Sequence, residues 1–570
     1  MFTALLMSGL AWYLYRPVLN PLEVNWLLHE GDTFQHYIGW HFFRREEWGW
    51  PLGAIENLAS DLSTSIVFTD SLPLLALPLK LFHGWLPDPF QYLGLWMLTN
   101  YALNGFFATR LLLRMHLPIP VALAGALLMS SLPIISARGL GMHGHEALTA
   151  HWLIFLAIEY TLFLSRPTFG NAAKWLALLT LAVLTHFYLF FMVGTFWAVW
   201  WCSHIVREYR HTRHNGNFMQ HLKPWIPIGM ATPLAVLMVM WSAGYILPGR
   251  ESTPPGGYGY FSAELLTYFN PSSSSSWFHE EIPSMSRLFK GWNPSIGGQY
   301  EGMAYMGAGV LLLWFSVAIT WLRSPSTSGN RMQGPALAVL IAAIILFLYA
   351  LAGRVSFFHG SIPLYYDSLF GPIRDYLRSS GRMVWPLGYV LLIGALVMLT
   401  RRWRPACMLP LLALAIVVQR EDLRVWYSMV HHNIENRAAA ARHDPKPFSV
   451  LHDSQLNDVW QSHDRLVAFP AQDLDALKPY LWLAAEHGMS INVAYLASQN
   501  IEMVKRATQP YHEAVAQGTL PEGAIYLVTD PELAQQACAL EGWVCREHPG
   551  VSVIWQSKRT GDTPEGEENQ

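Results

Sequence analysis

The stretch that decides the reading of this sequence is HEGDTFQHY (residues 29–37), which follows the first apolar segment, residues 1–20, almost immediately. It places the carboxylates of Glu30 and Asp32 beside a segment suited to hydrocarbon, among several tryptophans. Aromatic residues gather at the boundary between membrane and water, so we expect a loop at that boundary. Carboxylates this close to hydrocarbon are costly unless they are paired or used, which makes both acids candidate functional groups. The alternative for Asp32 is a role in capping a helix or in loop structure.

The composition is that of a membrane protein with a soluble addition. Of 570 residues, 52% are hydrophobic and 14% are charged, whereas soluble proteins carry about a quarter charged residues. We therefore predict a helical, multi-pass membrane domain over residues 1–420, a globular domain over 421–558 and a disordered polar tail over 559–570. The net charge of −3 and the lack of a basic stripe give no indication of nucleic-acid binding. The N-terminus lacks a basic start and a cleavage site, which favours a retained first span.

Apolar runs predict about 11 membrane spans, because a span needs roughly 20 mostly apolar residues. The run 174–206 is too long for one straight span, and we expect it to break at residues 185–188. After residues 1–20, the candidate spans are 91–113, 119–137, 147–164, 174–187, 188–206, 224–247, 303–322, 335–352, 383–400 and 405–419.

The segment 66–85 decides the topology, since it is apolar but contains Asp70, Lys80 and two prolines. If it forms a re-entrant or interfacial helix, the arginine-rich short loops all fall on one side, which is then the cytoplasmic side. We therefore expect a cytoplasmic N-terminus and a C-terminal domain outside the cytoplasm. The long loops that share the outer face with that domain are 21–90, 248–302 and 353–382.

A short outer loop, residues 139–146, supplies His143, His145 and Glu146. Two histidines and a carboxylate could contact a substrate or hold a divalent ion. Histidines at an interface that are simply hydrated by water are, however, more common.

Two further outer loops end where a helix is expected to begin. Tyr300 and Glu301 close the loop 248–302, and Glu301 is either a site residue or a helix cap.

The loop 353–382 ends with Arg374, Arg378 and Arg382 on the side where topology disfavours positive charge. We expect these arginines to serve a partner, either the phosphate of a ligand or an acid of another loop. Arg378 and Arg382 would share one face of a helix that started there.

The C-terminal part reads as a small α/β domain. Its strands are predicted at 465–470, 525–530 and 551–555, and its helices at 474–487, 498–516 and 531–540. No nucleotide-binding glycine motif or nucleophile elbow occurs in it, so we expect a lid, a binding platform or a stability module. Cys538 and Cys545 form a disulfide if the domain lies in an oxidising compartment, and are otherwise two free thiols.

Acids that face arginines at a membrane surface suit one reaction in particular. The phosphate of a lipid-linked sugar needs cationic groups, and guanidinium forks match phosphate oxygens. The acceptor hydroxyl needs a base, and a positioned carboxylate supplies one.

The layout resembles the GT-C superfamily of membrane glycosyltransferases, which use polyprenyl-phosphate sugars, through an uncharacterised bacterial branch. The shared features are a first span followed by an acidic outer loop, many further spans, outward loops and a periplasmic α/β domain. The resemblance covers roughly residues 1–420. The motifs that carry it are GDTFQHYIGW (31–40), SIVFTDS (65–71), GQYEG (298–302) and RSSGR (378–382).

This resemblance implies a glycosyltransferase of the bacterial inner membrane that works on the periplasmic face. It implies transfer of a sugar, with inversion, from a polyprenyl-phosphate donor to a hydroxyl of a lipid-linked glycan, lipopolysaccharide or protein. Asp32 is then the general base, with Glu30 second, and Arg374, Arg378 and Arg382 hold the donor phosphate. The remaining outer-loop residues would contact the acceptor or substrate; they are His143, His145, Glu146, Tyr300 and Glu301.

Many relatives carry two adjacent acids, whereas Gly31 separates Glu30 from Asp32 here. Which carboxylate acts therefore stays open, as does a divalent cation (Mg or Mn) held by Asp32, His143 and His145.

Two other functions compete with transfer. One is a transporter or flippase for a lipid-linked glycan, which predicts charges in the middle of spans and internal repeats. Glu159 is the clearest charge of that kind, and no repeat is evident. The other is a non-catalytic factor in envelope-glycan assembly.

Overall fold

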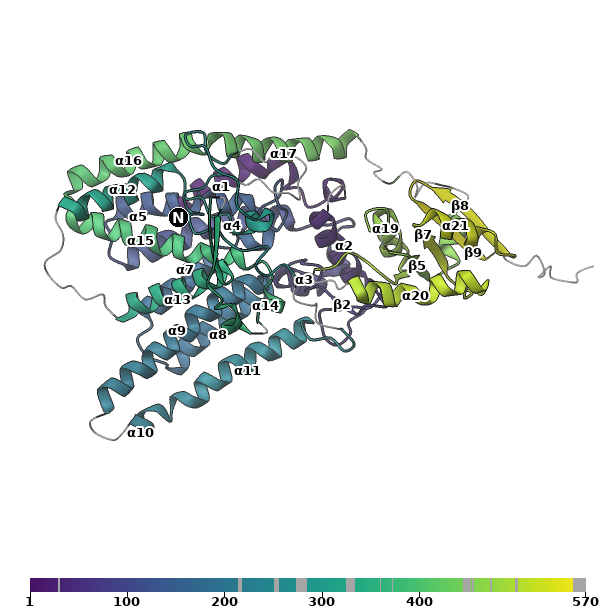
Figure 1. The fold of residues 1–570 in the computed structure, drawn as a ribbon, viewed down its shortest axis with the longest axis horizontal. Helices are drawn as coiled ribbons and strands as arrows, with labels where there is room; N and C mark the ends of the chain where they lie inside the picture. Colours follow the sequence, from purple (N-terminus) through teal and green to yellow (C-terminus); the bar gives the residue numbers. More distant parts are fainter. Residues whose placement is uncertain are drawn as a thin grey trace, which may run out of the picture. The chain divides into compact units, whose positions relative to one another are not determined.

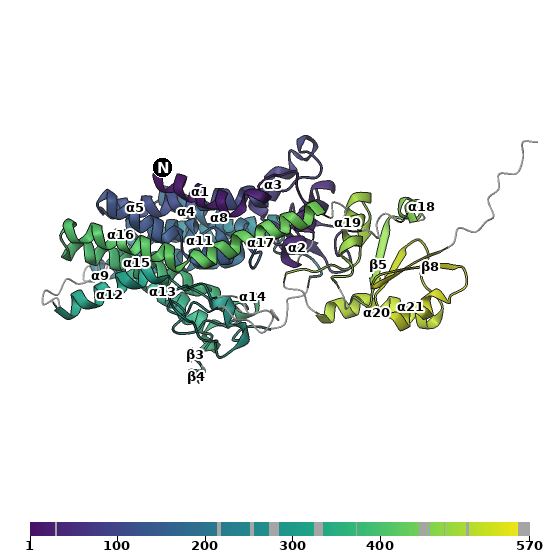
Figure 2. The same ribbon diagram turned by 90° about the horizontal axis from the view of Figure 1, so that it is seen from above.

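The computed structural model describes residues 1–28, 31–213, 218–250, 256–272, 284–323, 334–358, 360–371, 373–443, 448, 453, 456–471, 474–497 and 501–556 (Figures 1 and 2). The chain divides into two compact units. We call the first the helical unit, comprising Met1–Trp26, Leu86–Met240 and Thr253–Asp444. The second, the mixed unit, comprises Leu27–Trp85, Trp241–Ser252 and Pro445–Gln570.

Apart from the polar helix α17, the main helices of the helical unit lie where the apolar runs predict them, with the short α6 continuing the run of α5. They are α1 (Phe2–Tyr15), α4 (Leu93–Arg114), α5 (Ile119–Ser130), α6 (Pro133–Ala137), α7 (Trp152–Phe163), α8 (Phe169–Thr185), α9 (Phe187–Thr212), α11 (Trp225–Ala243), α12 (Ala308–Arg323), α13 (Gly334–Leu351), α15 (Trp385–Arg402), α16 (Pro405–Asp422) and α17 (Arg424–His443). In the helical unit, α4 contacts α1, α5 and α7, while α13 contacts α7, α9 and α15.

Fewer helices than expected are both long enough and apolar enough to span a membrane. Five segments of the described chain are long and apolar enough to cross a membrane: Ile119–Ala137, Phe187–Thr212, Trp225–Ala243, Gly334–Leu351 and Ser380–Arg402. Three further apolar helices of the described chain, α7, α8 and α12, are shorter. The 12 residues of α7 rise only about 18 Å, against a hydrocarbon core of about 30 Å.

The predicted break in the long apolar run is confirmed. His186 has extended backbone angles, φ −168° and ψ 139°, between the end of α8 and the start of α9. Its Nδ1 accepts a hydrogen bond of 3.1 Å from the backbone N–H of Tyr188. His186 thus caps α9 and ends α8.

The mixed unit contains the predicted α/β fold. Its sheet has the strand order β6-β5-β7-β9-β8, in which β5 is parallel to β6 and β7, and β9 is antiparallel to β7 and β8. The strands are β5 (Arg465–Phe469), β6 (Ser490–Ile491), β7 (Ile525–Val528), β8 (Trp543–His548) and β9 (Val551–Gln556). The helices of this part of the chain are α18 (Asn457–Gln461), α19 (Lys478–His487), α20 (Ile501–Gln517) and α21 (Pro531–Cys538) among the described residues. The buried side chains of Phe469, Tyr526 and Ile554 belong to its core.

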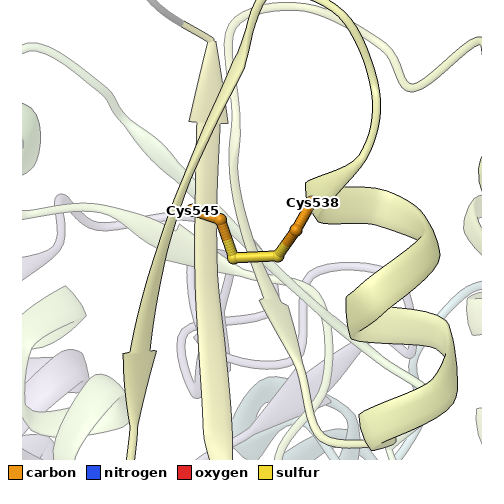
Figure 3. Close-up of a disulfide and its surroundings, with 2 residues drawn as sticks. All are labelled: Cys538 and Cys545. Atoms are coloured by element: carbon orange, nitrogen blue, oxygen red, sulfur yellow. A yellow bond between two sulfur atoms is a disulfide. The ribbon is translucent and has the colours of Figure 1, made fainter.

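Cys538 and Cys545 form a disulfide between the end of α21 and strand β8 (Figure 3). The structure therefore shows the pairing rather than two free thiols.

The mixed unit also contains a helix where we expected a loop. Residues Gly31–Arg45 form α2, and nearly all of its side chains are buried, among them Phe34, Trp40 and Phe43. The loop prediction is wrong because the aromatic and aliphatic side chains of this stretch are buried together with polar ones such as Gln35 and His41, so the segment folds as a helix inside the mixed unit.

Helix α2 packs against α19, from the C-terminal part of the chain. His41 Nε2 lies 2.6 Å from Glu486 Oε1, and the ring of Trp482 stacks on His41 with centroids 4.5 Å apart. Arg45 also pairs with Glu486, at 3.0 Å. Residues 27–85 thus fold with the C-terminal domain, which differs from the predicted division at residue 420.

The ambiguous segment 66–85 contains α3 (Pro73–Lys80), whose 8 residues are too few to cross a membrane. Lys80 Nζ lies 4.0 Å from the ring centroid of Phe43 and 4.8 Å from that of Trp48. It also donates a hydrogen bond of 3.1 Å to the carbonyl of Glu47. The charged group of Lys80 in this apolar segment is therefore stabilised by contacts within the protein.

Candidate functional site

A buried carboxylate held by two arginines forms the strongest polar cluster of the helical unit. Arg382 donates two parallel hydrogen bonds to Glu301, Nε to Oε2 at 2.7 Å and an Nη atom to Oε1 at 2.9 Å. Arg138 pairs with Glu301 Oε2 at 2.7 Å and donates to the Glu301 carbonyl at 2.8 Å. The three side chains are 0–6% exposed. We call Arg138, Glu301 and Arg382 the arginine–glutamate cluster.

Two glycines let the backbones that carry this cluster touch. Glu301 lies in the 3-10 helix η5 (Gly297–Gly302), and Arg382 lies in η7 (Ser380–Val384). A Cβ atom on Gly381 would lie 2.6 Å from the Cα of Gly302. This close approach explains why the motifs that contain Glu301 and Arg382 each place a glycine next to the charged residue.

We expect the substitution Gly381→Ala to destabilise the helical unit by about 1–3 kcal/mol, the usual effect of forcing an extra methyl into a packed core. The added carbon would displace backbone atoms, which cannot turn aside as a flexible side chain can. Thermal unfolding of the detergent-solubilised protein measures the effect.

Gly394→Ala is the matched control, since Gly394 lies in the adjoining helix α15 and a Cβ there meets nothing within 4 Å. It should leave stability unchanged or raise it, because alanine favours a helix interior. Equal unfolding temperatures for the two variants would contradict the close approach.

The electrostatics of the cluster favour charged side chains. Burial on its own raises the pKa of Glu301, but Arg138 and Arg382 outweigh it and hold that pKa well below its usual range. Burial lowers the pKa of Arg138, and Glu301 counteracts the shift. Two guanidinium groups on one carboxylate leave the cluster with a surplus positive charge.

Aromatic rings surround the cluster. The Cζ atom of Arg382 lies 4.7 Å from the ring centroid of Tyr188, and that of Arg138 lies 5.8 Å from Trp385. His151 stacks on the other aromatic partner, Trp385, with centroids 4.8 Å apart. These rings shield the charges from water, so the interactions within the cluster act at a lower effective dielectric than at the surface.

His143 and Tyr300, two of the predicted site residues, lie together at this cluster. Their rings stack with centroids 5.5 Å apart. Burial, reinforced by the charge of Arg138, lowers the pKa of His143 to about 3, so its imidazole is neutral at pH 7. His145 is half-buried in the same turn and lies close enough to influence the carboxylate of Glu301 electrostatically.

Glu146 is fully buried at the start of the 3-10 helix η4 (Glu146–Thr149). Its carbonyl accepts hydrogen bonds from Trp96 Nε1 at 3.1 Å and from Thr149 Oγ1 at 2.7 Å. Its backbone therefore has a structural role, and a contact of its side chain with a substrate stays a prediction.

The three loop arginines do not form one set. Arg378 is exposed in the non-helical residues between α14 (Ile373–Tyr376) and η7, so the prediction that it shares a helix face with Arg382 is wrong. Arg374 pairs with Asp367 at 3.5 Å on the surface. For Arg382 the sequence left two partners open, a ligand phosphate or an acid of another loop. In the structure Arg382 pairs with an acid of another loop, Glu301.

Asp32 lies, half-buried, in the first turn of α2 in the mixed unit, where a negative charge also favours the helix dipole. Glu30 lies outside the described residues. The cation predicted for Asp32, His143 and His145 stays a prediction, because the two histidines belong to the helical unit.

Sequence reasoning missed Arg138, the second cation on Glu301. Its position in the sequence gives a signal, because it directly follows the predicted span 119–137, on the side where the predicted topology disfavours arginine.

The described chain is thus a mostly helical protein with membrane-length helices and a small α/β sheet domain. It matches the family model described as "Domain of unknown function (DUF6311)" over residues 4–424. Residues 455–555 match the model "DUF6311 C-terminal domain". The chain belongs to the DUF6311 family. No curated protein matches it significantly.

Proposed function

We propose that the protein is a GT-C-like glycosyltransferase of the bacterial inner membrane, with about 11 membrane crossings and its C-terminal domain in the periplasm. It would move a sugar from a polyprenyl-phosphate donor to a hydroxyl of a lipid-linked glycan, lipopolysaccharide or protein. The apolar helices and the order of the motifs along the chain support this proposal.

The observation that carries the proposal is the surplus of buried donors around one carboxylate. Arg138 Nε and Trp385 Nε1 are buried and have no hydrogen-bond partner among the described residues. Buried donors are rarely left unpaired, so such groups call for a partner that the described residues do not supply. An oxygen of an anionic phosphate is a suitable partner, because guanidinium and indole N–H groups only donate.

The proposed chemistry balances without a redox partner. Asp32 takes the proton of the acceptor hydroxyl, the acceptor oxygen bonds to the anomeric carbon, and the bond from that carbon to the phosphate oxygen breaks. Polyprenyl phosphate leaves with the bonding electrons, and a cationic site stabilises its charge. We assign that cationic site to Arg138 and Arg382 rather than to the half-buried Arg374 or the exposed Arg378.

The C-terminal domain then has a role in this reaction. Glu486 and Trp482 of α19 hold His41 of α2, and α2 carries Asp32 in its first turn. In this proposal the domain is the platform that positions the base.

Glu159, the mid-span charge that a transporter would be expected to use, forms ion pairs in the structure. Glu159 of α7 lies 2.9 Å from Arg110 and 2.5 Å from Arg114, both of α4, and its side chain is 1% exposed. A carboxylate that two arginines hold is a poor carrier of a coupling ion, which disfavours the transporter.

The experiment that tests the proposal uses the purified full-length chain in nanodiscs with a panel of short-chain polyprenyl-phosphate sugars and crude envelope acceptors. Mass spectrometry follows the release of polyprenyl phosphate. We expect release with at least one donor, dependent on acceptor. Absence of release from every donor, with protein that remains folded, would contradict the proposal.

The disulfide gives a prediction about localisation. In a Cys202→Ser, Cys407→Ser background, we expect a maleimide to label the denatured protein only after reduction, because Cys538 and Cys545 are paired. With Cys538→Ser added, an impermeant maleimide should label Cys545 in intact spheroplasts. Labelling only after lysis would place the domain in the cytoplasm.

A further inference from the structure

A groove opens on the surface of the helical unit between the end of α1 and the second half of α17. Its volume is about 480 Å³. The polar residues and the alanine that line it are Arg16, His432, Glu435, Asn436, Ala439 and Arg442. The α17 residues recur at intervals of three and four, so they form one helix face, and Ala439 leaves space in its middle.

The groove carries more positive than negative charge. Arg16 and Glu435 form an exposed ion pair of 3.6 Å, and Glu435 also contacts His431 at 3.3 Å. Exposed pairs of this kind are weak, so a ligand can compete for the arginine. Among the described residues, Arg442 has neither an ion-pair partner nor a side-chain hydrogen bond. Two guanidinium groups therefore face a single carboxylate.

The sequence of α1 indicates the level of the groove relative to a membrane. Leu5 and Leu6 are exposed, and Trp12 and Tyr13 follow as exposed aromatic residues. Aromatic side chains of this kind mark the membrane–water boundary, and Arg16 comes one turn later, at the level of lipid head groups. Tyr13 stacks on His431 of α17, with ring centroids 4.5 Å apart, so α17 passes at the same level.

We propose that this groove binds the phosphate of an anionic membrane lipid, with Arg16 and Arg442 as the cationic groups. Guanidinium forks match phosphate oxygens in geometry as well as in charge. Asn436 and His432 supply side chains that can hydrogen-bond to the rest of the head group. This site is separate from the arginine–glutamate cluster and does not depend on the proposed transfer reaction.

The test uses the full-length protein in nanodiscs of phosphatidylcholine, alone or mixed with phosphatidylglycerol, and measures retained lipid by native mass spectrometry. We expect the double variant Arg16→Gln, Arg442→Gln to bind phosphatidylglycerol roughly 25-fold more weakly, about fivefold for each basic residue. If the double variant unfolds, the test is repeated with each single variant, which should bind phosphatidylglycerol about fivefold more weakly.

Arg424→Gln is the matched control. Arg424 lies on the same helix, is 57% exposed against 58% for Arg16, and pairs with Glu421 at 3.7 Å, close to the 3.6 Å of Arg16 and Glu435. Loss of lipid in the groove variants alone supports the proposal. Retention equal to the unchanged protein, or equal loss in the control, overturns it. The same spectra are recorded with added inorganic phosphate. If the protein retains inorganic phosphate through these two arginines but retains no lipid, the groove binds free phosphate and the lipid assignment is overturned.

Discussion

Replacing Glu301 by glutamine is expected to lower the free energy of unfolding by about 3–5 kcal/mol, the usual cost of removing one partner from a buried ion pair. The substitution leaves the guanidinium groups of Arg138 and Arg382 buried without a counter-charge. Because the pKa of Glu301 lies below its ordinary value of 4.5, its contribution is complete at neutral pH. That contribution is lost only as the pH falls below 4.5 towards the lower pKa of the folded state. Chemical denaturation in detergent at pH 7 measures the full effect.

Glu421→Gln provides a closely matched control. Glu421 also contacts two arginines, Arg287 at 3.2 Å and Arg424 at 3.7 Å, but its side chain is 38% exposed. Surface pairs contribute about 0–1 kcal/mol, so this variant should be nearly as stable as the unchanged protein. If Glu301→Gln costs no more than Glu421→Gln, the arginine–glutamate cluster does not stabilise the fold as we describe.

Replacing Asp32 by asparagine is expected to reduce the rate of sugar transfer by about 10²–10⁴-fold, the contribution of a positioned general base. Asparagine caps helices about as well as aspartate does. The loss of the charge at the helix N-terminus should lower stability by about 0.3–1 kcal/mol. The release of polyprenyl phosphate measures the rate, and thermal unfolding measures the stability.

This substitution separates the two roles that the sequence left open for Asp32. Glu532→Gln is the control, since Glu532 is likewise an acid in the first turn of a helix of the mixed unit, α21. It should leave the transfer rate unchanged. A normal rate in Asp32→Asn would show that Asp32 serves the helix and not the chemistry.

The positions of the long helices could be predicted because long apolar runs are a local signal. The break at His186 was predictable for the same reason, since no single span accommodates the run around it. The number of membrane crossings stays a prediction, because helices such as α7 are apolar yet shorter than a bilayer is thick. Strand β6, with two residues, is too short to leave a periodic pattern.

The candidate site was harder to predict, since it depends on contacts between distant residues. His41 and Glu486 are 445 positions apart, and nothing local to either residue indicates their pairing. The motif RSSGR suggested two arginines on one helix face. The chain is not helical at residues 377–379, so Arg378 is exposed while Arg382 is buried against Glu301. The glycines beside Glu301 and Arg382 are understandable only once the backbones are seen to touch.

The most direct test of the central claim is the mass of the envelope glycans in a deletion strain that expresses the unchanged protein, Asp32→Asn or Glu421→Gln at equal protein levels. Our account predicts that one glycan lacks a sugar in the deletion strain. The unchanged protein and Glu421→Gln should restore that sugar, and Asp32→Asn should not. Restoration by Asp32→Asn, or a deletion that leaves every glycan unchanged, would contradict the account.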